Sequence, residues 1–241
     1  MPPPRAPWTG QPDPTDNARV NDDLIKRLVA LDTCAVSDAL DHLGIPGATT
    51  GIGPMWPGCP RIAGRARTVE VADAASIPGG GRHMATSTVA AATAGDVIVI
   101  ANRGRTDVSC WGDIIATAAQ VNGVAGTVVD GACRDVDAVA ALGYPLWARA
   151  AVPVTARGRI ADRANDVPVP FAGITVHPQD LVLADGSGVV FLPSSRAAEI
   201  IETAERLAAR QEAMIAAIRG GASVVEVMAD ARFRSALGGN A

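Results

Sequence analysis

The chain has 241 residues, of which 48% are hydrophobic and 19% charged, a composition that suits a folded core and argues against a disordered chain. The formal net charge of -4 gives no reason to expect nucleic acid as a partner, and no apolar run is long enough to span a bilayer. The length suits one α/β domain or two small ones, and we expect a cytoplasmic protein without a membrane segment.

The composition changes along the chain and predicts three parts. Residues 1–20 contain six of the 17 prolines and few apolar residues, which predicts a flexible extension. We place one α/β domain at 21–195, because no repeat or linker divides it. Residues 196–241 form a predicted helical segment that packs on this domain or on a neighbouring subunit.

Two helices are predicted at the start of the domain. The first begins at Asn21 or Asp22, and the second begins at Asp32, whose carboxylate suits an N-cap. The second helix ends at Gly44. Asp38 on this helix has two interpretations, a solvated residue or a catalytic acid, and the residues alone favour the solvated one.

Strands and one further helix are predicted between residues 65 and 101. Residues 65–71 alternate like a strand, 83–94 fit a helix and 96–101 fit a buried strand. The glycines at 79–81 lack the G-K-[ST] end of a phosphate loop, so they predict a turn. No G-x-G-x-x-G motif is present, which weighs against a Rossmann-type nucleotide or S-adenosylmethionine site.

Arg103 and Arg105 lie in a predicted loop just before the central unit of the chain. Two arginines at this point suit a substrate with several carboxylates. A solvated loop explains them equally well, because such charges are common at a surface.

The central unit is predicted as a helix, a turn and a buried strand, followed by Arg134 and Asp135. Gly112 and Asp113 suit a helix start, where an acidic residue interacts with the positive end of the helix dipole. Residues 124–129 then fit a short buried strand. Polar groups at strand and helix ends are where α/β proteins place chemistry. The predicted apolar face of the helix consists of Ile114, Ile115, Ala118, Ala119 and Val121.

The last third of the chain predicts a hairpin and a long helix. Residues 180–184 and 189–192 read as two strands joined by a tight turn, so Asp185 before Gly186 is better explained by turn chemistry than as a metal ligand. A helix is predicted from Ser194 to the Gly220 break.

The cysteines and the single lysine restrict the chemistry. The four cysteines have no C-x-x-C spacing, which favours buried free thiols over a zinc site. Cys133 beside Arg134 leaves a nucleophilic thiol as a minor alternative. Lys26 lies on an amphipathic helix and is a poor Schiff-base candidate. Carbonyl chemistry in this protein should therefore use a metal instead of a lysine Schiff base.

The motifs above resemble the RraA-like family, which includes metal-dependent 4-hydroxy-4-methyl-2-oxoglutarate / 4-carboxy-4-hydroxy-2-oxoadipate aldolases and the ribonuclease E regulator RraA. Asp113, twenty further residues and Arg134-Asp135 match the D-x20-R-D signature of this family. Supporting stretches are 36–41, 95–100 and 180–190. The resemblance implies a swivelling β/β/α-type layered α/β domain that assembles as trimers or hexamers, with sites between subunits.

The resemblance also implies a mechanism and its residues. The substrate would be a small oxo acid, a 4-hydroxy-2-oxo acid cleaved to pyruvate and a second oxo acid, with oxaloacetate decarboxylation as a side activity. Asp135 would bind Mg2+ or Mn2+, Arg134 would hold the substrate, and Asp113 would orient the water that moves the proton. The N–H groups of Ile114 and Ile115 would bind the pyruvate carboxylate. The family's aldolases carry an acid, commonly glutamate, at the position of Asp38, and often a glycine-rich stretch where Arg103 and Arg105 stand here.

Two alternatives stay open. Without the resemblance, Arg134 and Asp135 are best read as a local ion pair, since such pairs are usually structural. The second alternative is a non-catalytic regulator, similar to RraA, that binds a ribonuclease or helicase.

Overall fold

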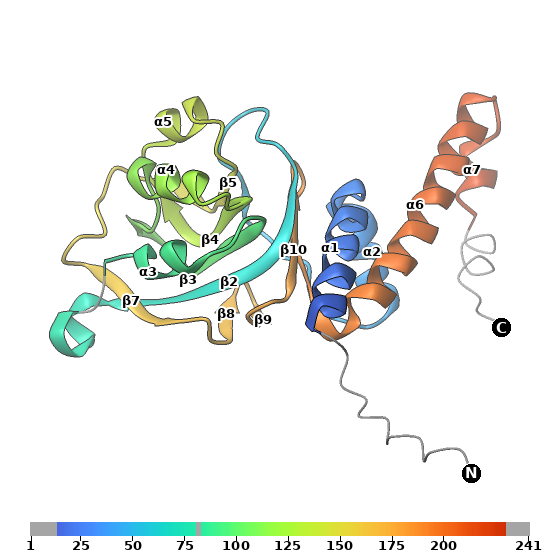
Figure 1. Ribbon diagram of the computed structural model, residues 1–241. Helices are drawn as coiled ribbons and strands as arrows, with labels where there is room; N and C mark the ends of the chain where they lie inside the picture. Colours follow the sequence, from blue (N-terminus) through green and yellow to red (C-terminus); the bar gives the residue numbers. More distant parts are fainter. Residues whose placement is uncertain (1–13, 81–82, 230–241) are drawn as a thin grey trace, which may run out of the picture.

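The structure is a computed structural model that describes residues 14–80 and 83–229. Its centre is one large mixed sheet with the strand order β1-β5-β4-β3-β2-β10-β11. The sheet curls until β1 contacts β11, so it forms a nearly closed barrel (Figure 1). The strands on this path are β1 (Gly53–Pro54), β2 (Ile62–Asp73), β3 (Asp96–Ser109), β4 (Gly126–Cys133), β5 (Leu146–Ala148), β10 (Leu181–Asp185) and β11 (Gly188–Leu192).

The middle of the sheet is parallel and the ends are antiparallel. β2, β3, β4 and β5 run parallel to one another, whereas β10 pairs antiparallel with both β2 and β11. All eight residues of β4 are buried. Strands covered on both faces need continuous apolar runs, which is why the sequence signal for β4 was strong.

Large apolar side chains fill the inside of the barrel. Phe171 packs edge-on against Phe191, with their ring centroids 5.1 Å apart. The indole Nε1 of Trp147 donates to the backbone oxygen of Asp185 at 2.9 Å, so this buried polar atom is satisfied. The smaller strands around the barrel are β6 (Ala150–Ala151), β7 (Ile160–Asn165), β8 (Val169–Phe171) and β9 (Ile174–Val176).

Three short helices pack outside the parallel strands and carry the central unit. They are α3 (Thr86–Ala91), α4 (Asp113–Val121) and α5 (Val136–Ala141). Their core includes the buried rings of Trp111 and Tyr144, which stack with centroids 6.0 Å apart.

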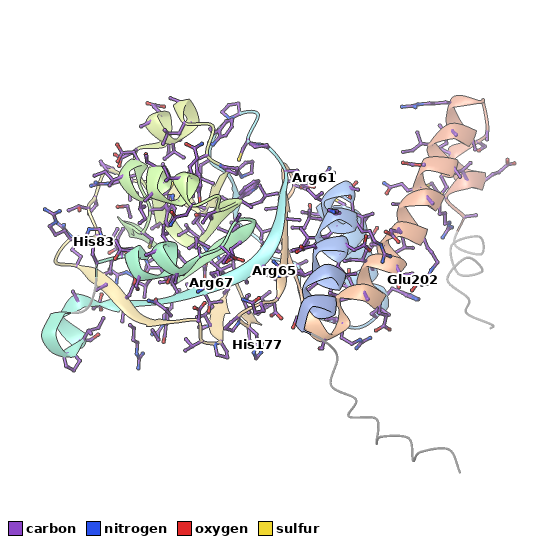
Figure 2. All side chains as sticks on the ribbon, viewed as in Figure 1. Arg61, Arg65, Arg67, His83, His177 and Glu202 are labelled. Atoms are coloured by element: carbon purple, nitrogen blue, oxygen red, sulfur yellow. The ribbon has the colours of Figure 1, made fainter. Side chains whose placement is uncertain are left out.

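A second group of helices packs on β10 and β11, at the other end of the molecule from α4 and α5 (Figure 1). It consists of α1 (Pro14–Ala30), α2 (Thr33–His42) and α6 (Ala197–Arg219), and the short α7 (Val224–Val227) contacts α6. Arg27 on α1 forms two hydrogen bonds to Glu205 on α6. Arg65, which Figure 2 labels on β2, lies 2.6 Å from Asp22.

Several predicted elements are confirmed. The carboxylate of Asp32 caps α2 by accepting from the Ala35 amide at 2.7 Å. The 180–192 hairpin forms as β10 and β11. In its turn Asp185 accepts from the Ser187 amide at 2.9 Å, as turn chemistry requires, and it also accepts from the Thr33 amide at the start of α2.

Other boundaries needed correction. α1 begins at Pro14, so residues 14–20 are helical rather than part of a flexible extension, and residues 1–13 lie outside the described part. β3 continues through the predicted loop after Ala101, with two register shifts against β4. β7 and β8 were not predicted. Among the described residues, no helix is both long enough and apolar enough to cross a membrane.

Candidate active site

The site is built where β3 joins α4 and where β4 joins α5. The Cys110 amide donates to Ala132 O at 2.7 Å, and the Arg134 amide donates to Trp111 O at 2.9 Å. These two backbone bonds hold the junctions against each other. Asp113, the first residue of α4, therefore lies beside Arg134 and Asp135, as the sequence pattern predicted.

Asp135 has an unusual backbone and a side chain that serves the site. Its φ and ψ are 56° and 35°, the left-handed region that costs a residue other than glycine energy. It is the N-cap of α5 but makes no side-chain cap bond. Instead its Oδ2 lies 3.0 Å from Arg134 Nε and 3.4 Å from the Asp113 backbone nitrogen. Strained residues of this kind concentrate at functional sites.

Gly112 permits this close approach. A Cβ at this position would lie 2.6 Å from Oδ2 of Asp135 and 3.2 Å from Nε of Arg134. Both distances are too short for ordinary contacts, so any side chain here would displace the Asp135 carboxylate. The absence of a side chain at Gly112 thus leaves room for this carboxylate, whereas sequence analysis assigned Gly112 only to a helix start.

The start of α4 differs in detail from the predicted anion site. The Ile114 amide donates to the Oδ1 atom of Asp113 at 2.7 Å, whereas the Ile115 amide has no acceptor among the described residues. The predicted apolar face of this helix was partly wrong. Ala116 and Ala119 are its buried residues, and the side chain of Ile114 is 79% exposed.

Two hollows open on either side of Asp113 and Arg134. The first, of about 320 Å³, extends over Trp111 and toward the loop after β6. The second, of about 510 Å³, contains Asp135. Both are lined by Asp113 and Arg134, so these two residues can contact a ligand in either space. The first hollow is lined by His83, Met84, Thr86, Ser109, Cys110, Trp111, Gly112, Asp113, Ile114, Ile115, Arg134, Thr155, Ala156 and Arg157.

Arg103 and Arg105 do not join this site within one chain. Arg105 is held by Asp73 at 2.6 Å and Asp107 at 2.9 Å, and Arg103 lies 3.8 Å from Glu70. Neither lines the two hollows around Arg134. Their predicted contact with the same substrate is therefore not supported in a single chain, because acids on β2 and β3 hold or approach them elsewhere.

Asp38 is also remote from the other candidate residues. It is exposed on α2, which packs against α6, β10 and β11 rather than against α4 or α5. Partial burial, with the nearby carboxylates of Asp41 and Asp32, raises the pKa of Asp38 above its usual value. That direction suits a proton donor, but within one chain Asp38 does not reach Arg134.

Asp113, Asp135 and Asp137 are the acids that line the second hollow, and the first two are the candidates for binding a metal here. Among the described residues, no group of three or more His, Cys, Asp or Glu side chains is arranged to hold a metal ion, so a closed site made only by protein is absent from that part of the chain. Mg2+ commonly binds through one or two carboxylates and keeps several waters. The open hollow around Asp135 fits that mode of binding.

Two other candidate groups, a thiol and a lysine, do not contribute to the chemistry of the site. Cys133 is fully buried, and burial raises the pKa of its thiol to about 12, so it is not a nucleophile at neutral pH. Cys34 is exposed and Cys59 is half-buried, which corrects the expectation that all four thiols are buried. Lys26 is exposed on α1, as expected.

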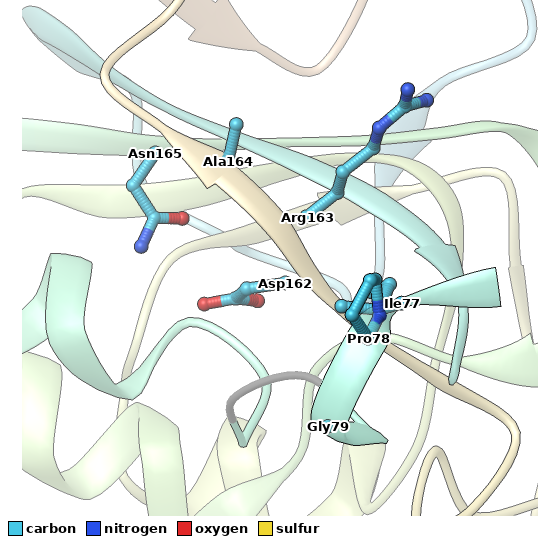
Figure 3. A pocket seen from close by; sticks show the side chains of 7 residues that line it. All are labelled: Ile77, Pro78, Gly79, Asp162, Arg163, Ala164 and Asn165. Carbon is cyan, nitrogen blue, oxygen red and sulfur yellow. The ribbon is translucent and has the colours of Figure 1, made fainter. Parts of the chain in front are cut away.

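A hollow of about 530 Å³ lies elsewhere, between β7 and the turn at Pro78 (Figure 3). Its buried acid, Asp162, accepts from the Ala85 amide at 2.9 and 3.1 Å, which is a structural role at the start of α3. None of the signature residues lines this hollow. We therefore place the candidate active site at Asp113, Arg134 and Asp135.

Comparison with known sequences shows which proteins this chain resembles. A sequence model described as RraA-like, Aldolase/RraA, matches residues 33–191. A protein of Halalkalibacterium halodurans named "Putative 4-hydroxy-4-methyl-2-oxoglutarate aldolase" is 34% identical over 196 residues, 81% of this chain and 89% of that protein. Protein DlpA of Legionella pneumophila is 29% identical over 222 residues, which are 91% of this chain but only 36% of DlpA.

Solved structures show the same fold. A crystal structure of an uncharacterized protein from Pseudomonas syringae pv. tomato aligns with a TM-score of 0.77 at 36% identity, covering 86% of this chain and 96% of that one. Streptomyces coelicolor RraAS2, described as an unusual member of the RNase ES inhibitor RraA family, aligns with a TM-score of 0.71 at 29% identity, covering 86% and 98%.

Proposed function

This chain belongs to the RraA-like family, and from that premise we propose that it is a divalent-metal-dependent carbon–carbon lyase that cleaves a 4-hydroxy-2-oxo acid to pyruvate and a second oxo acid. Oxaloacetate decarboxylation is the proposed side activity, because it also leaves a pyruvate enolate. The four free cysteines agree with the cytoplasmic location that we propose.

One observation carries the proposal: Asp113, Arg134 and Asp135 converge beside open space. Arg134 and Asp135 each keep about a third of the side chain exposed, at 35% and 33%, so both can contact a ligand. The strained backbone of Asp135 is not required by α5, because the side chain does not cap that helix. A local ion pair alone would not need this arrangement.

The reaction assigns a task to each group. Cleavage removes the proton of the C4 hydroxyl, breaks the C3–C4 bond and leaves the electron pair on the pyruvate enolate, which then takes a proton at C3. Arg134 binds the keto acid through charge-assisted hydrogen bonds. The free Ile115 amide, at the positive end of α4, interacts with the substrate carboxylate. Asp113 orients the water that carries the proton.

Asp135, with Asp113 beside it, would hold Mg2+ or Mn2+. When bound, the cation supplies Lewis-acid stabilisation of the oxygen that becomes negatively charged during cleavage. The chain itself keeps the carboxylate of Asp135 in place through its contact with Arg134. Glycine at position 112 leaves the space that this carboxylate occupies.

We further propose that the site lies between subunits of a trimer or hexamer. Ile114 beside the site and Val121 at the other end of α4 expose 79% and 81% of their surface, more apolar area than a helix usually leaves to water. A proton-transfer role for Asp38 requires such an assembly, since α2 lies away from α4 in one chain. Sedimentation analysis of the wild type and of Val121→Glu tests this, and a monomeric wild type would contradict it.

The test of the activity is pyruvate release from 4-hydroxy-4-methyl-2-oxoglutarate and from oxaloacetate with Mg2+, with Mn2+ and with EDTA. We expect metal-dependent release that Arg134→Ala and Asp135→Ala each reduce by at least about 100-fold. Arg196→Ala is the matched control, because Arg196 and Glu199 form an exposed ion pair on another face. Unchanged turnover in both Arg134→Ala and Asp135→Ala would contradict the proposal.

A regulator that binds a ribonuclease is the second candidate, favoured by the likeness to RraAS2 and by apolar residues exposed beyond the packed half of α6. The decisive assay adds the purified protein to a ribonuclease E-type enzyme and measures RNA cleavage. Inhibition without any oxo-acid turnover would favour this candidate over the lyase. The exposed apolar residues are Ile215, Ile218, Val224, Val225 and Met228.

A further inference from the structure

The 320 Å³ hollow beside Arg134 has a second cation in its lining. Arg134 and Asp113 line one part of it, and the loop that follows β6 contributes Thr155, Ala156 and Arg157. A substrate whose keto acid contacts Arg134 can therefore also contact this loop. The question is which group of the substrate the loop would bind.

Arg157 differs from the other arginines near the site. Its guanidinium forms no hydrogen bond and no ion pair with any described residue, and its backbone amide donates to Thr155 Oγ1 at 3.3 Å. Arg105 by contrast is bound by two carboxylates, and Arg134 is bound by Asp135. Among the arginines whose side chains are described, Arg219 on α6 is the other one without a partner. An unpaired guanidinium that lines a hollow is available to an anion.

Backbone hydrogen bonds fix the loop that carries the exposed Arg157 side chain. Val154 O accepts from both the amide and the hydroxyl of Ser109, at 3.0 and 2.6 Å, which ties the root of the loop to the end of β3. The turn itself closes through the Arg159 amide, which donates to Ala156 O at 2.9 Å. Arg157 is therefore presented by an ordered turn, which reduces the entropy lost on binding.

The apolar lining of the hollow strengthens a contact between Arg157 and a carboxylate. Buried Met84 and Trp111, with Ile114 and Ile115 at the helix start, give much of its lining an apolar character. A carboxylate that leaves water for such a surface needs a cation, and a charge-assisted hydrogen bond is stronger there than at an open surface. Arg157 is the free cation of this lining.

We infer that Arg157 is the specificity-determining residue that binds the carboxylate remote from the reacting keto acid. The inference rests on the proposed function, and it selects 4-hydroxy-2-oxo acids with a second carboxylate over monocarboxylates. In this role Arg157 takes the place of Arg103 and Arg105, which the sequence analysis had assigned to the carboxylates of the substrate.

The experiment compares two substrates that differ only at the remote group: 4-hydroxy-4-methyl-2-oxoglutarate and 4-hydroxy-4-methyl-2-oxopentanoate, which has a methyl group in place of the remote carboxylate. Arg157→Gln should lower kcat/KM for the dicarboxylate by about 10- to 100-fold, mainly through KM, and change the monocarboxylate little. Arg157→Lys should recover part of the lost kcat/KM, because lysine keeps the positive charge but lacks the paired N–H donors of the guanidinium. Arg219→Gln, which removes an equally unpaired arginine on α6, should behave as the wild type.

Binding without turnover separates this inference from the proposed function. The Kd values of 2-oxoglutarate and 2-oxopentanoate are measured by calorimetry with Mg2+ present. If Arg157→Gln weakens the binding of 2-oxoglutarate but not that of 2-oxopentanoate, the inference is supported. This holds even if the wild type cleaves neither substrate, and that outcome would contradict only the proposed lyase activity. Equal effects on both ligands, or equal effects of Arg157→Gln and Arg219→Gln, overturn the inference and leave the lyase proposal intact. A wild type that neither binds nor cleaves any of these acids overturns both.

Discussion

The Nε atom of Arg134 lies 3.0 Å from Oδ2 of Asp135, and this contact joins two consecutive residues across a left-handed backbone turn. The turn directs both side chains toward the start of α4 instead of along α5. The same Oδ2 lies 3.4 Å from the Asp113 amide. The pair is thus a local ion pair, as the residues alone suggested, and it is also the wall of a ligand-sized hollow.

The first prediction separates the backbone strain at Asp135 from the catalytic role of its carboxylate. Asp135→Gly should be about 1 kcal/mol more stable than Asp135→Ala, because glycine adopts a φ of 56° without steric cost while alanine does not. Both variants lose the carboxylate, so both should lose lyase activity. Urea unfolding monitored by circular dichroism provides the comparison, and equal midpoints for the two variants would show that the backbone is not strained.

The second prediction concerns space at Gly112. Gly112→Ala should lower activity by at least about 10-fold while the protein stays folded, since a Cβ would lie 2.6 Å from Oδ2 of Asp135. Gly186→Ala is the matched control, because a Cβ there meets nothing within 4 Å and the backbone φ is not left-handed. Wild-type turnover in Gly112→Ala would mean that Asp135 can move without consequence.

The third prediction is that a divalent cation stabilises the folded protein through Asp135. At a Mg2+ concentration 100 times Kd, the gain should be about 2.7 kcal/mol in free energy of unfolding. EDTA should remove this gain, and Asp135→Asn should show little of it. Thermal unfolding with and without Mg2+ makes the measurement, and Asp137→Asn, another acid of the same hollow, is the control. The assignment fails if Asp137→Asn and Asp135→Asn respond alike.

The fourth prediction uses the pH dependence of Asp185. Burial opposes its ionisation, but hydrogen bonds from Thr33 and Ser187 outweigh burial and lower the pKa of Asp185 below its usual value. Because the folded-state pKa is the lower one, the stabilisation is complete above the unfolded pKa of about 3.9 and is lost as pH falls through the folded value. Asp185→Asn should thus cost about 1 to 3 kcal/mol at pH 7 and progressively less below about pH 4.

Urea unfolding at pH 7 and at pH 3 tests the Asp185 prediction. Asp41→Asn on the exposed side of α2 is the control and should change little at either pH. A cost of Asp185→Asn that does not depend on pH would mean that its hydrogen bonds, and not its charge, matter.

The fifth prediction concerns thiol chemistry. Burial raises the pKa of Cys133 to about 12, so Cys133→Ala should keep activity within about 3-fold of the wild type. In the folded wild type, iodoacetamide should label the exposed Cys34 before Cys133. Mass spectrometry after limited labelling reads this out, and rapid loss of activity on labelling of Cys133 would restore the nucleophile interpretation.

Much of the fold and part of the site followed from local sequence patterns. The start of α4 at Asp113, the buried strand before Arg134 and the β10–β11 hairpin were predicted because caps, turns and apolar runs are encoded by neighbouring residues. The residues alone placed polar groups at helix and strand ends, and the family resemblance grouped Asp113, Arg134 and Asp135 into one expected site.

Only the tertiary structure decided which side chains share a space. Arg105 is paired because β2 brings Asp73 beside it, while Arg157, in a loop that looked merely polar, lines the hollow because Ser109 holds Val154. Asp38 is remote because α2 packs on β10 and β11. These relationships depend on contacts between residues far apart in the chain, and periodicity and capping signals carry no information about such partners. The sequence by itself therefore determined the elements and the signature, whereas the packing of the barrel determined the set of charges that a substrate would meet.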